Sequence, residues 1–283
     1  MIDIKKVHEI DLLLLDEFIR VCNKNNLQWF ADSGTLLGAI RKGEMIPWDD
    51  DIDVIMPRKD YNKLLSIADK EFKEPFFFQS PISDKFWNLT CKLRYSNSTF
   101  FSSDKYSRNE HDNLCNKGIF IDIFVFDNVP INKDIFETEQ IFLRFMFCFS
   151  TMKKYALKNN TISYDAKEVF KFMNDSITNI SESNKETKYV ANMFFNYQRK
   201  YRNFVISKQA YSSYKEINFK GLKHKLRIPI GYKEILTLWY GDDWMIEKKI
   251  NSTHGVGAAF YDTKNSYHSY ENLSFDDYMK LFD

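Results

Sequence analysis

The chain has 283 residues, of which 44% are hydrophobic, so it can bury a sizeable core in one large domain or in a catalytic domain with an appended part. Its 40 basic and 39 acidic side chains give a net charge of +1, and neither end carries a block of like charge. This balance excludes the electrostatic footprint of a nucleic-acid-binding protein.

The cysteines and the apolar segments indicate in which compartment of the cell the protein is expected. The four cysteines are Cys22, Cys91, Cys115 and Cys148. Without a C-x-x-C pair they are predicted to be reduced core thiols, and neither a disulfide frame nor a zinc site. The start of the chain lacks a signal-peptide pattern because Asp11 and Asp16 flank a run of only four leucines. The longest apolar stretch, residues 141–149, is too short to cross a bilayer, so we expect a cytoplasmic protein.

Apolar residues recur at spacings of three and four over residues 4–24, which predicts an amphipathic helix capped by Asp3. A short strand is expected over residues 28–31, leading into a turn at Gly34. Residues 35–41 then begin like a helix whose first amides point outward. Such amides bind phosphate oxygens, although an ordinary turn is the alternative.

Four carboxylates follow Trp48 within five positions: Asp49, Asp50, Asp51 and Asp53. Carboxylates at this density repel one another, so a fold that orders them needs a compensating cation. On one strand, Asp51 and Asp53 project from the same face and can chelate a hard divalent ion. Oxygen ligands favour Mg²⁺ or Mn²⁺. A solvated loop is the alternative, although a tryptophan and an apolar strand are a poor setting for one.

Pro57 stands at the start of a predicted helix that reaches Phe72, and strands are predicted over residues 76–79 and 88–95. On the second of these strands, Lys92 and Arg94 share a face. Two cations on one strand face are typical of a solvated edge. Beside an acidic strand they are also candidates for binding a diphosphate.

Residues 118–127 read GIFIDIFVFD, which predicts a central strand. Asp122 shares a face with three phenylalanines, where an unpaired carboxylate would be costly or have a strongly raised pKa. A metal ion removes that cost, so we interpret Asp122 as the third carboxylate of the site. A protonated or helix-capping Asp122 is the alternative. Asp127, at the end of the strand, is interpreted as a turn former.

The second half of the chain is predicted to be mostly helical. Helices are expected over residues 132–158 and 183–201, with a loop over 159–182 that contains a weak helix near 166–173.

A further helix is expected after Pro229, with Gly241 as a C-cap of positive φ. The next residue, Asp242, either orients a substrate hydroxyl or caps the helix. His254 lies in a glycine-containing loop and is a candidate general base.

Three sequence pieces between residues 34 and 61, GTLLGAIR, IPWDDDIDV and MPRKDY, resemble the signature of the LicD family of phosphotransferases, which includes the fukutin-related proteins. That family is similar to the nucleotidyltransferase superfamily, in which a Gly-Ser/Thr turn precedes a D-x-D metal site. The resemblance implies that Gly34 and Thr35 form the turn and that Asp51 and Asp53 hold the metal. It also places an acidic residue at Asp122, supports Lys92 and Arg94 as diphosphate ligands, and matches Asp242 to a Y-G-D element.

The catalytic and metal-binding residues that we predict are Asp51, Asp53 and Asp122. The predicted substrate-binding residues are Gly34, Thr35, Arg41, Trp48, Asp49, Lys92, Arg94, Asp242 and His254. The predicted fold is α/β (α+β), with a small nucleotidyltransferase-like mixed sheet flanked by helices. Residues 1–130 are expected to form the catalytic core, and residues 131–283 a mostly helical part that completes the active site on the acceptor side.

The resemblance implies a Mg²⁺-dependent transfer of phosphocholine from CDP-choline onto a sugar hydroxyl of a bacterial surface glycan, which is lipopolysaccharide, teichoic acid or capsule. The partners would be a CDP-linked alcohol and a glycan or glycolipid, met in the cytoplasm or at the inner face of the membrane. The aromatic candidates for a choline cage are Trp48, Trp87, Tyr95 and Phe101, which are more often core residues. Transfer of ribitol, glycerol or ethanolamine phosphate, transfer of a nucleotide, and a catalytically inactive glycan-binding module remain open.

Overall fold

The computed structural model describes residues 3–84, 90–102, 115–142, 145, 166–192, 205–247, 259–271, 273, 277 and 280–282. Trp87, Cys148 and His254 lie outside the described residues. Cys22, Cys91 and Cys115 are buried and form no disulfide, as predicted for core thiols. No helix in the described part of the chain is both long enough and apolar enough to cross a membrane.

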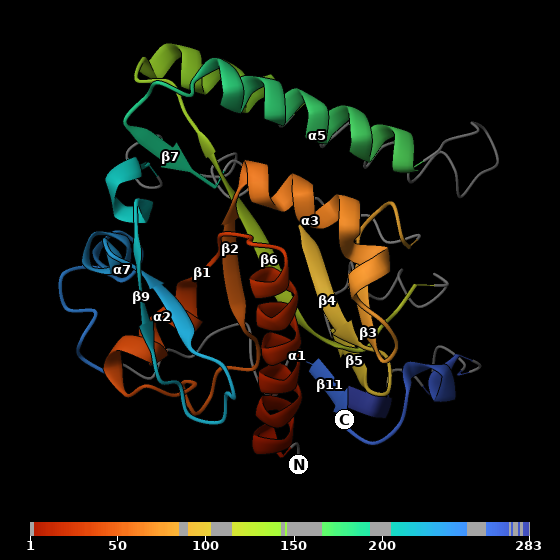
Figure 1. Ribbon diagram of the computed structural model, residues 1–283. Coiled ribbons are helices and arrows are strands. Elements are labelled where there is room, and N and C mark those ends of the chain that lie inside the picture. Colours follow the sequence, from red (N-terminus) through yellow and green to blue (C-terminus); the bar gives the residue numbers. More distant parts are fainter. Residues whose placement is uncertain are drawn as a thin grey trace.

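A mixed sheet of seven described strands lies at the centre of the molecule (Figure 1). Its main order is β1-β2-β6-β4-β3, and β7 and β8 extend it beyond the end of β6. The bounds are β1 Phe30–Ala31, β2 Asp53–Pro57, β3 Phe76–Gln79, β4 Cys91–Tyr95, β6 Ile119–Asn128, β7 Tyr189–Ala191 and β8 Ile206–Ser207. Strands β2 and β6 are parallel, and the other pairs are antiparallel. This mixed α/β architecture confirms the predicted fold class.

Strand β6 is central because its residues are apolar on both faces. Ile119, Ile121 and Ile123 are almost fully buried on one face, and Phe124 and Phe126 are buried on the other. Helix α1 (Ile4–Lys24) packs against β4 and β6, and α3 (Arg58–Glu71) against β2 and β6. In Figure 1 both helices cross in front of the sheet. Helix α2 (Ser33–Arg41) instead packs against β2 and α7 (Tyr232–Tyr240).

The elements predicted for the first half are confirmed with small shifts at their ends. Helix α1 has the predicted bounds, but the Asp3 side chain at its N-cap makes no capping hydrogen bond. Helix α3 follows Pro57 as predicted. Helix α2 begins one residue before Gly34, so the expected turn is the first turn of this helix. Ser33, directly before Gly34, has a φ of 46°, in the left-handed region.

The second half contains strands that the sequence analysis did not predict. The weak helix expected near 166–173 is confirmed, and as α5 (Ala166–Ser183) it also takes the place of the end of the expected loop. The expected helix over 183–201 is wrong at its start, because residues 189–191 form β7. Val190 of β7 pairs with Asn128 of β6 and is buried. Pairing with a distant strand therefore overrides the local helical periodicity. Residues 133–142 are helical, which confirms the described part of the predicted helix 132–158.

Two small antiparallel pairs and three short 3₁₀ helices complete the described structure. One pair joins β9 (Tyr214–Ile217) to β10 (Leu226–Pro229), and the other joins β5 (Thr99–Ser102) to β11 (Ala259–Asp262). The 3₁₀ helices are η3 (Lys208–Tyr211), η4 (Tyr267–Tyr270) and η5 (Lys280–Phe282). Helix α7 ends at Gly241 with a φ of 84°, which confirms the predicted C-cap glycine.

A buried ion pair joins α3 to β6. Arg58 Nε and Nη2 donate to the two carboxylate oxygens of Asp127 over 2.8 and 2.7 Å, and Nη1 donates to Asn174 of α5 over 2.8 Å. Asp127 is 1% exposed, so the interpretation of this residue as a turn former is wrong. Its carboxylate instead fixes β6 to α3 through a bidentate pair with Arg58, which in turn binds α5.

Candidate metal centre

The start of β2 and the first half of β6 bring three carboxylates together. Asp53, the first residue of β2, is the register partner of Asp122 on the parallel strand β6. Asp51 lies just before β2. Each of these three side chains offers a carboxylate oxygen within 4.8 Å of the others. The structure therefore assembles the three residues predicted to hold a metal ion.

The electrostatics of this group suit a divalent cation. Burial, followed by the charges of Asp49, Asp122 and Asp50, raises the pKa of Asp51 to about 8. Burial, followed by the charges of Asp51 and Asp122, holds the pKa of Asp53 well above its usual range. Carboxylates that crowd in a partly buried site are stabilised as anions by a bound cation. The oxygen-only donor set is the one that Mg²⁺ and Mn²⁺ prefer.

Lys92 lies beside this group on the other side of β6. It is the register partner of Asp122 across the β4–β6 pair, and its Nζ lies 2.6 Å from Asp122 Oδ1. The ammonium also lies 3.4 Å from the centre of the Phe120 ring. Lys92 is 8% exposed, so the solvated-edge alternative is wrong. One lysine nevertheless supplies one positive charge against three carboxylates.

Arg94 is buried as well, but its guanidinium is used within the fold. Nε donates to Gln79 Oε1, and Nη1 donates to the Gly118 carbonyl over 2.6 Å. The side chain thus links β3, β4 and the start of β6. The structure brings Lys92, but not Arg94, into contact with the carboxylate group.

The start of α2 fixes the acidic segment from the other side. Thr35 Oγ1 accepts a hydrogen bond from the Asp53 amide over 2.9 Å, which holds the first residue of β2 in place. The Asp49 carboxylate lies so close to Gly34 that a Cβ at that position would collide with it. An acidic side chain is favourable at a helix N-terminus. Burial, followed by the charge of Asp50, still raises the pKa of Asp49 to about 6.

Three other predicted substrate residues lie around this region. Arg41, the last residue of α2, donates from Nε to the Trp244 carbonyl over 2.8 Å and from Nη2 to the Ile246 carbonyl over 2.9 Å. It therefore attaches the segment after α7 to α2. Trp48 is half-buried in the turn before the acidic residues. Asp242 is exposed in the turn after α7 and belongs to neither carboxylate group found among the described residues.

The aromatic cage candidates inside the described part of the chain pack against other rings. Tyr95 contacts Phe76 with ring centres 5.9 Å apart, and Phe101 stacks on Phe260 at the same distance. Packing in the core, which was the alternative to a choline cage, therefore describes both residues.

Several residues near the acidic group were missed by the sequence analysis. The Tyr261 hydroxyl on β11 donates a hydrogen bond to Asp50, and His8 Nε2 on α1 donates to the Asp49 carbonyl over 2.7 Å. Burial, followed by the charges of Asp53 and Asp32, raises the pKa of Tyr240 at the end of α7. These contacts arise between distant segments and leave no local sequence signal.

Two missed carboxylates are different, because their sequence context could have revealed them. Asp32 precedes α2 and is 3% exposed, and its burial raises its pKa to about 6. Asp11 falls on the apolar face of α1 and is fully buried. A charged residue on the apolar face of a predicted helix is a detectable signal.

The structure thus gathers three carboxylates on neighbouring strands of a mixed sheet, beside the start of α2. Residues 26–152 match the family model described as LicD/FKTN/FKRP, nucleotidyltransferase domain. The chain is 28% identical over 254 residues to the lipopolysaccharide cholinephosphotransferase LicD of Haemophilus influenzae. The matched region covers 82% of this chain and 87% of that protein. It is also 30% identical over 112 residues to an uncharacterised protein of Rickettsia typhi, covering 33% of this chain and 36% of that protein. These matches support a LicD family member and a transferase of the LicD type.

Proposed function

We propose that this protein transfers phosphocholine from CDP-choline to a sugar hydroxyl of lipopolysaccharide in a Mg²⁺-dependent reaction. The observation that carries the proposal is the convergence of Asp51, Asp53 and Asp122 within the LicD-type domain. The similarity to the LicD cholinephosphotransferase over most of both chains supports the transferred group and the acceptor class. Because such an acceptor is a glycolipid, the reaction would take place in the cytoplasm at the inner face of the membrane.

Asp51, Asp53 and Asp122 would hold the ion, whose charge would stabilise the negative charge that develops on the departing nucleotide phosphate. Thr35 holds the start of β2, so the Asp53 carboxylate stays in position when substrate enters. Lys92 neutralises part of the charge of Asp122, and its ammonium has further N–H donors for a phosphate oxygen. Gly34 leaves room for an anionic group at the start of α2.

Asp122 has two candidate roles in this scheme. It can complete the set of metal ligands, or it can accept the proton of the attacking sugar hydroxyl. Its ion pair with Lys92 favours the first role, because Asp122 Oδ1 already accepts a hydrogen bond from the Lys92 ammonium.

The other reactions that the site could perform differ in the bond that breaks in the donor. Phosphocholine transfer from CDP-choline releases CMP, whereas nucleotide transfer would place the cytidylyl group on the acceptor. Donors that carry ribitol, glycerol or ethanolamine would yield acceptors of other masses. The presence of both Asp51 and Asp53 argues against an inactive glycan-binding module.

The experiment that tests the proposal is a donor panel. The full chain is incubated with Mg²⁺, lipopolysaccharide and each CDP-linked alcohol in turn, and the acceptor is analysed by mass spectrometry. We expect a phosphocholine adduct and free CMP with CDP-choline, and neither product from Asp53→Asn. A nucleotide adduct, preference for another alcohol, or no product with any donor would contradict the proposal.

A further inference from the structure

A pocket lies on the same face of the sheet as the carboxylates of the metal centre, further along β2 and β6. Ile55 of β2 lies two residues after Asp53, and Phe126 of β6 lies four residues after Asp122. Alternate residues of a strand share a face, so both side chains line the pocket from the face that bears the two carboxylates. Further lining residues come from elements on the same side of β2 (Figure 1): Asp32 after β1, Val190 of β7, Ile206 of β8, Tyr211 of η3 and Trp239 of α7.

Asp32 brings a buried carboxylate to this pocket. The residue is 3% exposed and stands at the N-cap of α2, yet its side chain makes no capping hydrogen bond. The carboxylate instead accepts a hydrogen bond from the Ser33 hydroxyl over 3.3 Å. Ser33 itself has a left-handed φ of 46°, a conformation that costs free energy in a residue other than glycine. Capping of the helix therefore does not explain why an acidic residue stands here.

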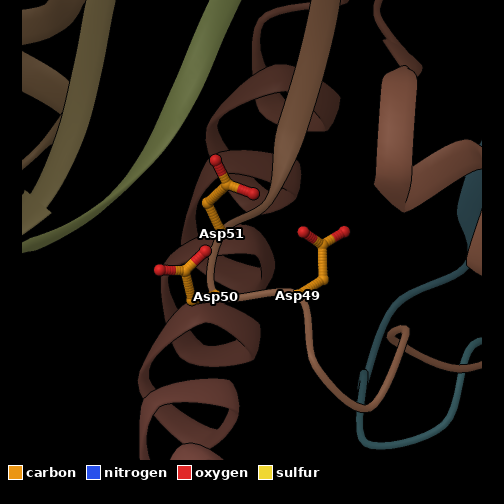
Figure 2. A group of neighbouring side chains, drawn as sticks. All are labelled: Asp49, Asp50 and Asp51. Carbon is orange, nitrogen blue, oxygen red and sulfur yellow. The ribbon is translucent and has the colours of Figure 1, made fainter. Parts of the chain in front are cut away.

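The charge of Asp32 has no positive partner in the pocket. None of the described residues that line the pocket is basic. Asp32 also belongs to neither group of carboxylates that could share a metal ion within the described ranges. Figure 2 shows one of those groups, Asp49, Asp50 and Asp51, on the short stretch of chain before β2. Because a buried and unpaired carboxylate is costly, a positively charged ligand would stabilise this arrangement.

The walls of the pocket suit a cation that is covered by methyl groups. Tyr211 stacks on Phe126 with ring centres 4.4 Å apart, and Trp239 supplies a third, half-buried ring. Ile55 and Val190 add aliphatic surface. Aromatic faces attract quaternary ammonium groups. Such a group has no N–H to satisfy, so it loses less than a primary ammonium or a metal ion when it enters apolar surroundings.

The pocket lies at a suitable distance from the metal centre. The Asp32 amide donates to the Asp53 carbonyl over 3.1 Å, so the two residues are direct neighbours. Asp53 and Ile55 are about 6.6 Å apart along β2. Four bonds separate phosphorus and nitrogen in phosphocholine, which is about 5–6 Å at ordinary bond lengths. The space between the lining side chains is about 300 Å³ with its part open to solvent included, which suits one end of a donor.

We propose that this pocket binds the quaternary ammonium headgroup of the donor, with Asp32 as the counter-charge and the rings of Tyr211, Phe126 and Trp239 as the walls. The inference rests on the proposed function, because it assigns a place to one part of the CDP-choline molecule. Asp32 then determines which alcohol is accepted and takes no part in breaking the donor.

The test compares the binding of CDP-choline and of CDP-glycerol, whose alcohol is uncharged, to the full chain in Mg²⁺ by isothermal titration calorimetry. We expect the wild type to bind CDP-choline at least about 10-fold more tightly. Asp32→Asn, which is similar in size, should weaken CDP-choline at least about 10-fold and leave CDP-glycerol unchanged. Trp239→Leu should reduce the same preference, because leucine has no aromatic face.

Three further variants separate the pocket from the rest of the molecule. Asp16→Asn changes a buried carboxylate of α1 that is bonded to His224, and Trp244→Leu changes a buried tryptophan that does not line the pocket. Both should keep the wild-type preference. Asp53→Asn should weaken both donors, because they share the diphosphate, and should keep the preference as well. Loss of transfer with the preference intact would therefore contradict the proposed function and not this inference.

Equal binding of the two donors by the wild type, or an unchanged preference in Asp32→Asn, would overturn the inference. An equal loss of affinity for CDP-choline, CDP-glycerol and CMP in Asp32→Asn would also overturn it, because Asp32 would then serve the cytidine part or the metal centre. Circular dichroism establishes that each variant is folded. If Asp32→Asn does not fold, the preference of Trp239→Leu decides, and an unchanged value overturns the inference.

Discussion

Asp122 and Lys92 form an ion pair within the group of carboxylates. Burial of Asp122 among phenylalanines predicted that the carboxylate needs a positive partner, and the structure places Lys92 Nζ 2.6 Å from it. The pair does not replace a metal ion, because Asp51 and Asp53 bring two more carboxylates to the same place. We therefore propose that Lys92 works as a fixed counter-charge that limits the repulsion between these carboxylates.

This role predicts the effect of Lys92→Met. Removing one partner of a buried ion pair costs about 3–5 kcal/mol, so the variant should melt well below wild type without metal. Mg²⁺ should recover part of the loss, and the KM for CDP-choline should rise more than kcat falls. Thermal unfolding with and without Mg²⁺ and steady-state kinetics measure both effects. Lys24→Met, at an exposed lysine, is the control, and equal behaviour of the two variants would refute the role.

The raised pKa of Asp51 predicts how stability depends on pH. The value of about 8 in the folded protein lies above the 3.8 of an unperturbed Asp, so the folded state binds more protons between these limits. The stabilisation by this group is complete below about pH 4 and is lost as pH rises towards 8, at about 1.4 kcal/mol per pH unit. Denaturant unfolding in EDTA at pH 5 to 8 should show this slope.

Two comparisons isolate the contribution of Asp51 to that slope. Mg²⁺ should flatten it, because an ion-bound carboxylate is already ionised, and Asp51→Asn should flatten it without metal. Equal slopes for wild type and Asp51→Asn in EDTA would contradict the assignment.

At the scale of elements, local patterns predicted α1, α2, β2, α3 and β6, since each presents its own apolar periodicity and is bounded by Pro, Gly or polar residues. Three of the strands that were missed depend on distant partners. Thr99–Ser102 pairs with Ala259–Asp262, and Tyr189–Ala191 is a strand because β6 is beside it.

The same distinction between local patterns and distant contacts applies to the residues of the site. Asp51, Asp53 and Asp122 were predicted from strand alternation and burial, whereas the Tyr261 contact with Asp50 depends on a strand pair that no local pattern reveals.

The buried pair of Arg58 and Asp127 is expected to hold elements together without affecting the site. Arg58→Met should destabilise the protein by about 3–5 kcal/mol, because Asp127 would remain buried and unpaired between α3 and β6. Urea denaturation measures this loss. The increase in stability on adding Mg²⁺ should stay as in wild type, and a reduced Mg²⁺ response would show that the pair belongs to the metal site.

At the scale of the whole molecule, the site is assembled from both halves of the chain. The family model matches residues 26–152, yet Tyr261 contacts Asp50, and Arg41 holds the carbonyls of Trp244 and Ile246. Strand β11, more than 100 residues beyond the matched domain boundary, thus contacts the acidic group. This explains why the sequence motifs identify the chemistry but do not reveal its complete support.

The central claim is that three carboxylates, one just before β2, one on β2 and one on β6, hold the ion that makes phosphocholine transfer possible. Its most direct test is the rate of CMP release from CDP-choline by metal-stripped protein in the presence of lipopolysaccharide, as Mg²⁺ is added. The account predicts no release without a divalent ion and recovery with Mg²⁺. It also predicts at least about 100-fold slower release by Asp53→Asn at saturating Mg²⁺, because a loss of about 3 kcal/mol of charge stabilisation lowers the rate by this factor. Full CMP release in EDTA, or wild-type rates from Asp53→Asn, would contradict it.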